Sequence, residues 1–450
     1  MQEKQNHKQN PCNMRPKKTM SDADLFRSRF EQIIDLNHPL AKLSRQIDWT
    51  AFENKFGPLY TPDFGRPGLP IRLMVGLTYL SRMYDLSDEA VVEGWVENPY
   101  WQHFCGYEYF QHQFPLDPSS LVRWRKRIGV KGMEFLLQQT LITAQRNGQL
   151  KRRHLNKINV DTTVQEKNIT FPTDGKLYQR MRERLVKEVR KIGVTLRQSY
   201  ARVGKKALLL QSRYAHARQF KRARRQTKRL KTFLGRVMRD IRRQCPDPSG
   251  ALQELLARAD RLFAQEKQSK NKLYSVHAPE VECIAKGKAH KRYEFGCKVS
   301  VATTSRDNWV IGAQAVHGNP YDGHTLGGIL DQVCRLTGWQ AQEAYCDQGY
   351  RGHGYEGSTA VHIVDRKRKG ICRSERRWRN RRAAIEPVIG HLKYDHRMER
   401  NYLHGVIGDQ MNAILAGCGR NLCKLLQILL RLIFYHLFFA GFWYQRAKVA

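Results

Sequence analysis

The sequence of 450 residues predicts an α/β fold with a mixed sheet, preceded by an all-α region and interrupted by a long helical insertion. Three patterns predict it. Apolar residues recur at helical spacing up to about residue 130, and alternate as in strands at 157–164 and again beyond residue 290. A basic, helix-type segment of about 100 residues separates the two strand-type regions.

These patterns divide the chain into five parts. We expect a basic disordered tail at 1–20, a helical N-terminal domain at 21–150, and a sheet domain formed by 151–177 and 275–420. The insertion would span 178–274, and an apolar helix 421–450. Within residues 422–444, Lys424, Gln427, Arg431 and His436 interrupt the apolar run, which favours a core or interface helix over a membrane span.

In the N-terminal region, residues 70–98 predict two helices joined near Leu86, with Ser87 as the N-cap of the second. Residues 117–129 predict a further helix that carries a cluster of basic side chains. Helices joined by a short turn and followed by a basic helix are typical of DNA contact, although a solvated bundle face has the same pattern. The predicted DNA-binding residues of this helix are Arg123, Arg125, Lys126 and Arg127.

The insertion is strongly basic, since residues 178–274 contain 28 Lys and Arg but only 7 Asp and Glu. It predicts long helices, one of them over 214–244, with a break at 245–250 where Pro and Gly interrupt the pattern. A helical hairpin or coiled-coil arm is expected. This large excess of positive charge favours contact with the phosphates of DNA over a helix face that is simply exposed to solvent. The predicted contact residues are Arg222, Arg224 and Arg225.

After the insertion, residues 293–305 and 309–318 predict two strands separated by a turn at 306–308. A helix is expected from Asp322 to Gly338, then short strands that end near Asp347 and Asp365, and finally a basic helix through Glu386. Asp322 and His324 either cap the helix that follows them or line a site near DNA.

The overall charge indicates the class of partner. Lys and Arg total 79 against 41 Asp and Glu, a formal charge of +38. Such a field attracts polyanions, with nucleic acid the first candidate and an anionic membrane surface the second. The ten cysteines form no CxxC pair and no Cys/His zinc spacing, and no secretory signal precedes them, so free thiols in a reducing cytoplasm are expected.

Three acids stand at informative positions. Asp161 is predicted to end the first strand, Asp347 to end a later one, and Glu386 to lie at a helix start or kink because proline follows it. The ends of adjacent parallel strands lie side by side, so these carboxylates could meet. Such a trio binds Mg²⁺ through oxygen, and two ions can serve phosphodiester cleavage. Asp365 is the most credible rival to Asp347.

The motifs around these acids resemble those of the DDE transposases of bacterial insertion sequences, closest to the IS-five group. The resemblance rests on "VDTTVQEKNITFPTD", "HGNPYDGHTL", "DQGYRG" and "RAAIEPVIGHLK", and on residues 26–129 for the helical domain. It implies a ribonuclease H-like fold. Asp161, Asp347 and Glu386 would then hold two ions of Mg²⁺ or Mn²⁺. Arg382 and Lys393 match the arginine and the lysine of the sequence signature that surrounds the catalytic glutamate in such transposases.

That signature has a tyrosine where this chain has Arg379. Arg379 and His324 are expected to contact DNA. The basic insertion also follows the first strand, and not the second aspartate as in relatives. The implied function is cleavage at the element's terminal inverted repeats and joining of the 3′-hydroxyl to target DNA, by a cytoplasmic, nucleoid-associated dimer or larger assembly. A catalytically silent DNA-binding derivative and a nuclease of the same fold are the alternatives.

Overall fold

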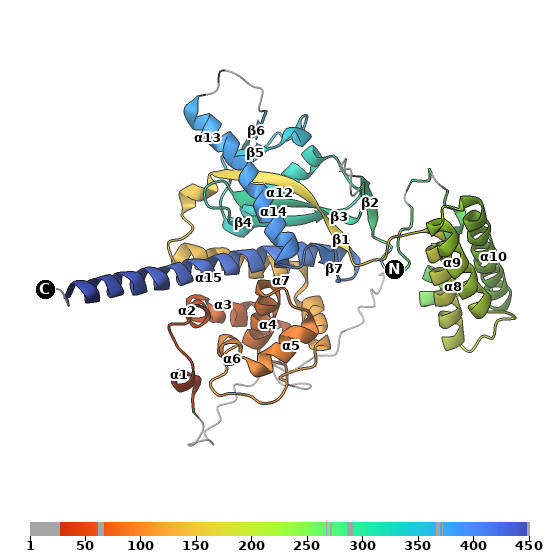
Figure 1. Cartoon of the computed structure of the whole chain (residues 1–450), viewed down its shortest axis with the longest axis horizontal. Helices are drawn as coiled ribbons and strands as arrows, with labels where there is room; N and C mark the ends of the chain where they lie inside the picture. Colours follow the sequence, from red (N-terminus) through yellow and green to blue (C-terminus); the bar gives the residue numbers. More distant parts are fainter. Residues whose placement is uncertain are drawn as a thin grey trace, which may run out of the picture.

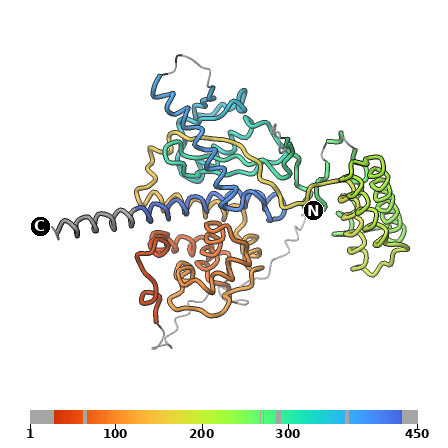
Figure 2. Tube along the Cα trace, in the orientation of Figure 1, coloured from red at the N-terminus to blue at the C-terminus, as the bar shows by residue number. Residues whose placement is uncertain are grey.

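A computed structural model describes residues 28–61, 67–266, 268–270, 272–285, 292–365, 370 and 372–447, with side chains up to residue 431. The expected tail at 1–20 lies outside the described residues. A mixed sheet lies on one side of the long helix α15 (Gly405–Ala447), and the N-terminal helices lie on the other (Figure 1). A separate helical unit projects from the end of the sheet (Figure 2).

All the regular elements described between residues 28 and 150 are helical. They are α1 (Phe30–Ile33), α2 (Pro39–Gln46), α3 (Trp49–Phe56), a 3-10 turn (Gly57–Leu59), α4 (Ile71–Met83), α5 (Asp88–Glu97), α6 (Pro99–Phe104) and α7 (Ser119–Arg146). The predicted cap is confirmed, because the Ser87 hydroxyl accepts from the Ala90 amide at 3.1 Å. The basic helix of the prediction is the first part of α7, which bends at Gly129 (φ 63°).

The sheet has seven strands. They are β1 (Lys157–Lys167), β2 (Glu282–Ala285), β3 (Tyr293–Thr304), β4 (Val310–Val316), β5 (Glu343–Cys346), β6 (Ala360–Ile363) and β7 (Arg400–Asn401). The main order is β2-β3-β1-β5-β6, with β4 beside β3 and β7 beside β1. Strand β3 is antiparallel to β1, whereas β5 and β6 run parallel to it. The expected mixed sheet is therefore confirmed.

Further helices lie between and after these strands. A 3-10 turn (Asp322–Thr325) leads into α12 (Leu326–Thr337), which ends at Gly338 (φ 65°), as predicted. Another 3-10 turn (Gln348–Tyr350) follows β5. Beyond β6 come α13 (Arg373–Arg381), a 3-10 turn (Arg382–Ala384) and α14 (Ile385–Tyr394). A last 3-10 turn (Arg152–Leu155) precedes β1.

The N-terminal helices and the sheet share one apolar core. Leu137 of α7, Ile158 of β1, Trp309 beside β4 and Leu415 of α15 belong to the same buried cluster. Residues 405–431 are long and apolar enough to cross a membrane, but 61% of their most apolar stretch is buried inside the structure. This part of α15 is therefore a core helix, as predicted for its residues 421–431. The prediction that the helix begins at 421 was wrong, because α15 begins at Gly405. The side chains of 432–444, also in the predicted run, lie outside the described residues.

The insertion is a bundle of four helices and not a simple hairpin. It contains α8 (Asp174–Lys191), α9 (Ala201–His216), α10 (Phe220–Gln244) and α11 (Gly250–Ala264), packed around an apolar core of their own. The break at 245–249 is confirmed. The prediction of one helix over 214–244 was wrong, because Arg218 adopts a left-handed conformation (φ 56°) between α9 and α10.

Candidate active site

Asp161 lies within a strand, and not at a strand tip as predicted. It is the fifth of the eleven residues of β1, because β3 pairs with β1 from Ile158 to Glu166 and so extends the strand. The Asp161 side chain is 15% exposed. One carboxylate oxygen accepts from the Thr162 amide at 2.8 Å, and the other lies 3.2 Å from an Arg382 nitrogen.

The register of the parallel pair brings Asp347 to Asp161. Asn159 of β1 lies opposite Tyr345 of β5, so the residues two positions further along each chain are these two aspartates. Asp347 follows the last residue of β5, and its Oδ1 accepts from the Gly349 amide at 3.0 Å. The expectation that a parallel pair would bring these carboxylates together thus agrees with the register, although only β5 ends there.

Glu386 reaches the site through an arginine. It is the second residue of α14, which agrees with the helix start expected before Pro387. Arg382 donates to Glu386 Oε1 at 2.8 Å and to Asp161 Oδ2 at 3.2 Å, so one guanidinium bridges the two acids. Glu386 is 61% exposed, which leaves its carboxylate free to move toward a ligand.

The charges of the site are not balanced. Burial raises the pKa of Asp161 to about 6, and the neighbouring Asp347 adds to this shift, while Arg382 opposes it. Oxygen donors in excess of the cations that face them are what a divalent metal ion needs. The residues present therefore fit Mg²⁺ held by Asp161, Asp347 and Glu386.

A fourth carboxylate, Asp322, lies at the same place. Its Oδ1 accepts from the Thr162 hydroxyl at 2.9 Å and from the Lys298 ammonium at 2.8 Å. A Cβ added to Gly349 would lie 3.3 Å from Asp322 Oδ2 and 3.0 Å from Asp347 Oδ1. These two oxygens are therefore within about 6 Å of each other. The sequence left open whether Asp322 caps a helix or lines a site, and the structure favours the second.

The other predicted residues near the site differ in position. Lys393 is half-buried on α14, seven residues after Glu386 and so on the same face, about 10 Å further along the axis. His324 is exposed and contacts the Tyr321 ring edge-on. Asp365, the rival acid, lies beyond β6, one strand further from Asp161, and pairs with Arg351 at 2.8 Å.

Two arginines predicted to contact DNA have structural partners instead. Arg125 is 7% exposed and forms a two-point ion pair with Asp88 in the first turn of α5. Arg379 is 5% exposed, pairs with Glu375 at 2.7 Å and donates to the Ile363 carbonyl. Arg125 thus joins α7 to α5, and Arg379 joins α13 to the end of β6, so neither presents its charge at the surface. The basic pattern of the sequence could not separate them from their neighbours.

The remaining predicted DNA-contacting residues are accessible. Arg123 and Lys126 are exposed on α7, and Arg127 is half-buried over the Tyr60 ring. The three arginines chosen in the insertion, Arg222, Arg224 and Arg225, are exposed on α10.

Comparisons with known proteins place the chain in a family. The family model described as "Transposase domain (DUF772)" matches residues 28–127, the segment from α1 into α7. A Rhizobium meliloti protein described as "Uncharacterized protein ORF8 in nfe locus" is 50% identical over 208 residues, which are 46% of this chain and all of that protein. The chain belongs to a transposase family. No solved structure matches it.

The transposase match and the acidic site involve different parts of this transposase-family chain. The family model ends at residue 127, before the first of the clustered acids at 161. The match therefore indicates a transposase role in general, and the chemistry must be argued from the acids themselves.

Proposed function

We propose that this chain is a DDE transposase with a ribonuclease H-like catalytic domain. It would bind the terminal inverted repeats of its insertion sequence, cleave the ends and join the 3′-hydroxyl to target DNA. The observation that carries the proposal is the pairing of Asp161 and Asp347 across parallel strands, with Glu386 connected to Asp161 by Arg382. The mixed sheet and the transposase-family match support it.

Asp161, Asp347 and Glu386 are the residues that would hold Mg²⁺. When bound, Mg²⁺ would activate water or the 3′-hydroxyl and stabilise the leaving oxygen. Arg382 pairs with Asp161 and Glu386, and it would be available to hold the scissile phosphate when a cation occupies these carboxylates. Lys393, on the same face of α14, would hold a phosphate further along the strand.

Asp322 is the proposed positioning residue of the site. Lys298 is 12% exposed, also donates to the Pro320 carbonyl, and so holds Asp322 Oδ1 in a fixed direction. Asp322 Oδ2 is then presented on the side of Asp347. From there it would accept a hydrogen bond from the attacking water or 3′-hydroxyl and so orient it.

DNA would be held by surfaces on both sides of α15. Arg123, Lys126 and Arg127 of α7, with His324 near the acids, would contact phosphate. The insertion adds the exposed arginines of α10. Two element ends must be processed together, so the active assembly would be a dimer or larger, in the cytoplasm on the nucleoid.

Cleavage of a labelled duplex that carries the element's own ends, with Mg²⁺ or Mn²⁺, tests the proposal. We expect Asp161→Ala, Asp347→Ala and Glu386→Ala to lose cleavage while they keep DNA binding, and Asp365→Ala to stay active as the matched control. Joined product on a plasmid would separate a transposase from a nuclease. If wild type binds the ends without cutting, the DNA-binding alternative replaces the enzyme. If all four variants cut equally, these acids are not the catalytic residues.

A further inference from the structure

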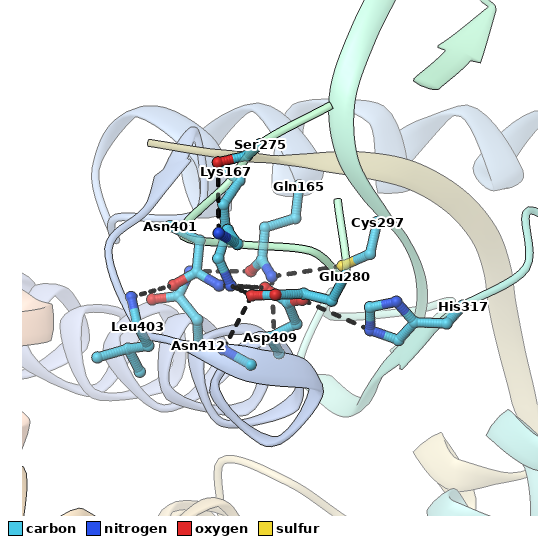
Figure 3. A network of polar contacts seen from close by, with 12 residues as sticks. Gln165, Lys167, Ser275, Glu280, Cys297, His317, Asn401, Leu403, Asp409 and Asn412 are labelled. Carbon is cyan, nitrogen blue, oxygen red and sulfur yellow. Dashed lines mark hydrogen bonds and ion pairs between the residues drawn. The ribbon is translucent and has the colours of Figure 1, made fainter. Parts of the chain in front are cut away.

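A second group of potential metal ligands lies away from the acids of the proposed active site. Cys297 of β3, His317 after β4 and Asp409 in the first turns of α15 each place a donor atom within 4.8 Å of the other two. Cys297 pairs with Gln165, four residues along β1 from Asp161, so the group lies about 13 Å from that aspartate along the strands. Figure 3 shows the three side chains in a buried polar network.

The orientation of His317 is set from outside the group. Its Nδ1 lies 3.3 Å from Glu282 Oε1, a carboxylate oxygen that also accepts from the Gly318 amide. A histidine whose Nδ1–H donates to a carboxylate presents the lone pair of Nε2 on its other side. This is the arrangement that commonly orients metal-binding histidines.

Nε2 of His317 is buried and makes no hydrogen bond. Asp409 Oδ2 lies 3.5 Å from it, so without a cation a lone pair faces a carboxylate oxygen. Either a proton or a metal ion must lie between them. The Cys297 sulfur is the third donor atom of the group, and it also accepts a hydrogen bond from the Gln165 amide at 3.7 Å.

Charges around the group leave room for a divalent cation. Among the described residues joined to the group by these ion pairs, the carboxylates are Glu280, Glu282 and Asp409, and the one lysine is Lys167. Its ammonium lies 2.8 Å from Asp409 Oδ1 and 2.9 Å from Glu280 Oε1. The Lys167 ammonium therefore contacts Asp409 through Oδ1, and the Oδ2 oxygen faces His317 and Cys297. Negative charge exceeds positive charge while His317 is neutral.

We propose that Cys297, His317 and Asp409 bind a Zn²⁺ ion, with water as a fourth ligand. A mixed set of thiolate, imidazole and carboxylate in a tetrahedral arrangement suits zinc better than Mg²⁺, which prefers oxygen alone. Binding removes the thiol proton of Cys297 to solvent, because the thiolate is the ligand. The zinc would connect β3, the end of β4 and α15.

The location gives this ion a structural role. His317 begins the segment that runs to Asp322, so the metal would anchor that segment five residues before the carboxylate presented to the active site. Lys167 and Glu280 of the same network lie where the chain leaves the sheet for the insertion and where it returns. The zinc would thus stabilise the junction of the sheet, the insertion and α15.

Metal analysis of the tag-free full-length protein, grown with Zn²⁺ and passed through gel filtration, tests the proposal. We expect one zinc per chain in wild type, in Cys283→Ser and in Asp347→Ala, and less than a tenth of that in Cys297→Ser and His317→Gln. Cys283 is the matched control because it lies on the adjacent strand β2, outside the group.

Substitution with Co²⁺ adds a reading that is independent of DNA cleavage. A thiolate-to-cobalt charge-transfer absorption should appear in wild type and disappear in Cys297→Ser. If Cys297→Ser does not fold, His317→Gln keeps the thiol and should lose stoichiometric binding. Wild type that retains no zinc, or a thiolate band that survives Cys297→Ser, would overturn the proposal and leave a protonated His317 as the link to Asp409.

Discussion

The replacement Asp161→Asn should stabilise the metal-free protein at neutral pH. Burial and Asp347 raise the pKa of Asp161 from 3.8 to about 6, net of the opposing Arg382. Two units at ~1.4 kcal/mol each correspond to about 3 kcal/mol spent on keeping this carboxylate ionised. Asparagine resembles the protonated form and avoids that cost. For a chain of this size, the gain is on the order of 3 °C in unfolding temperature.

The pH dependence follows from the direction of the shift. Because the folded pKa lies above the unfolded one, Asp161 contributes its full stability below about pH 4, and this is lost as pH rises through 6. The difference between Asp161→Asn and wild type should therefore be near zero at pH 4 and reach its plateau above pH 6. Groups that do not face Asp161 titrate equally in both proteins and cancel.

Thermal unfolding of both proteins from pH 4 to 8, in chelator and in millimolar Mg²⁺, is the assay. Mg²⁺ should raise the unfolding temperature of wild type at pH 7.5 and affect Asp161→Asn little, since the cation replaces the missing positive charge. Asp365→Asn is the control, because Asp365 follows β6, one strand further from Asp161, and already pairs with Arg351. A pH-independent difference, or an asparagine variant that is less stable at pH 7.5, would refute a desolvated metal-binding role for Asp161.

Three further predictions follow from the packing. Gly349→Ala should reduce end cleavage about tenfold with little loss of stability, because the new Cβ meets carboxylate oxygens of Asp347 and Asp322 at 3.0 and 3.3 Å; unchanged cleavage kinetics would exclude a close pair of carboxylates. Arg125→Ala should cost about 3 kcal/mol in urea unfolding, since it leaves Asp88 unpaired, and an equally stable variant would show that this pair is not structural. Replacing the exposed arginines of α10 by alanine should lower the magnitude of the slope of log K for DNA binding against log salt concentration by up to about 3, measured by fluorescence anisotropy. The arginines are Arg222, Arg224 and Arg225. An unchanged slope would show that α10 does not contact DNA.

The order of the elements could be predicted from the sequence because it depends on local periodicity. The α4–α5 turn with its Ser87 cap, the β3–β4 hairpin and the end of α12 at Gly338 all depend on residues within one or two turns of each other. The break between α9 and α10 was missed because the residues from 217 to 219 carry no proline or glycine. Packing around the core of the insertion, and not local propensity, sets that break.

The length of β1 was underestimated for a related reason. Gln165 and Lys167 look like the polar end of a strand, but they are 1% and 6% exposed. Their partners come from distant segments: Asn412 donates to Gln165, and Asp409 pairs with Lys167. A polar residue is buried at low cost when its hydrogen bonds are satisfied. The sequence shows the polar side chain and does not show the partner, so the predicted strand stopped at residue 164 although β1 continues to Lys167.

The same limit explains why the sequence pattern indicated one group of candidate ligands and not the other. The acids at 161, 347 and 386 could be predicted to meet because a strand, a strand and a helix follow a regular topology. The ligands proposed for zinc are 20 and 92 residues apart in sequence, and no local Cys/His pattern marks them. They meet because β3 and β4 are antiparallel neighbours and because α15 contacts β4. Asp409 enters the group through the first turns of this helix, which the sequence had not predicted to be helical, since the expected helix began at 421. The apolar face that packs α15 against the sheet thus also brings the polar side chain of Asp409 to the group. From sequence alone, the apolar pattern of the helix does not predict the polar contacts, and the polar residues do not predict the packing.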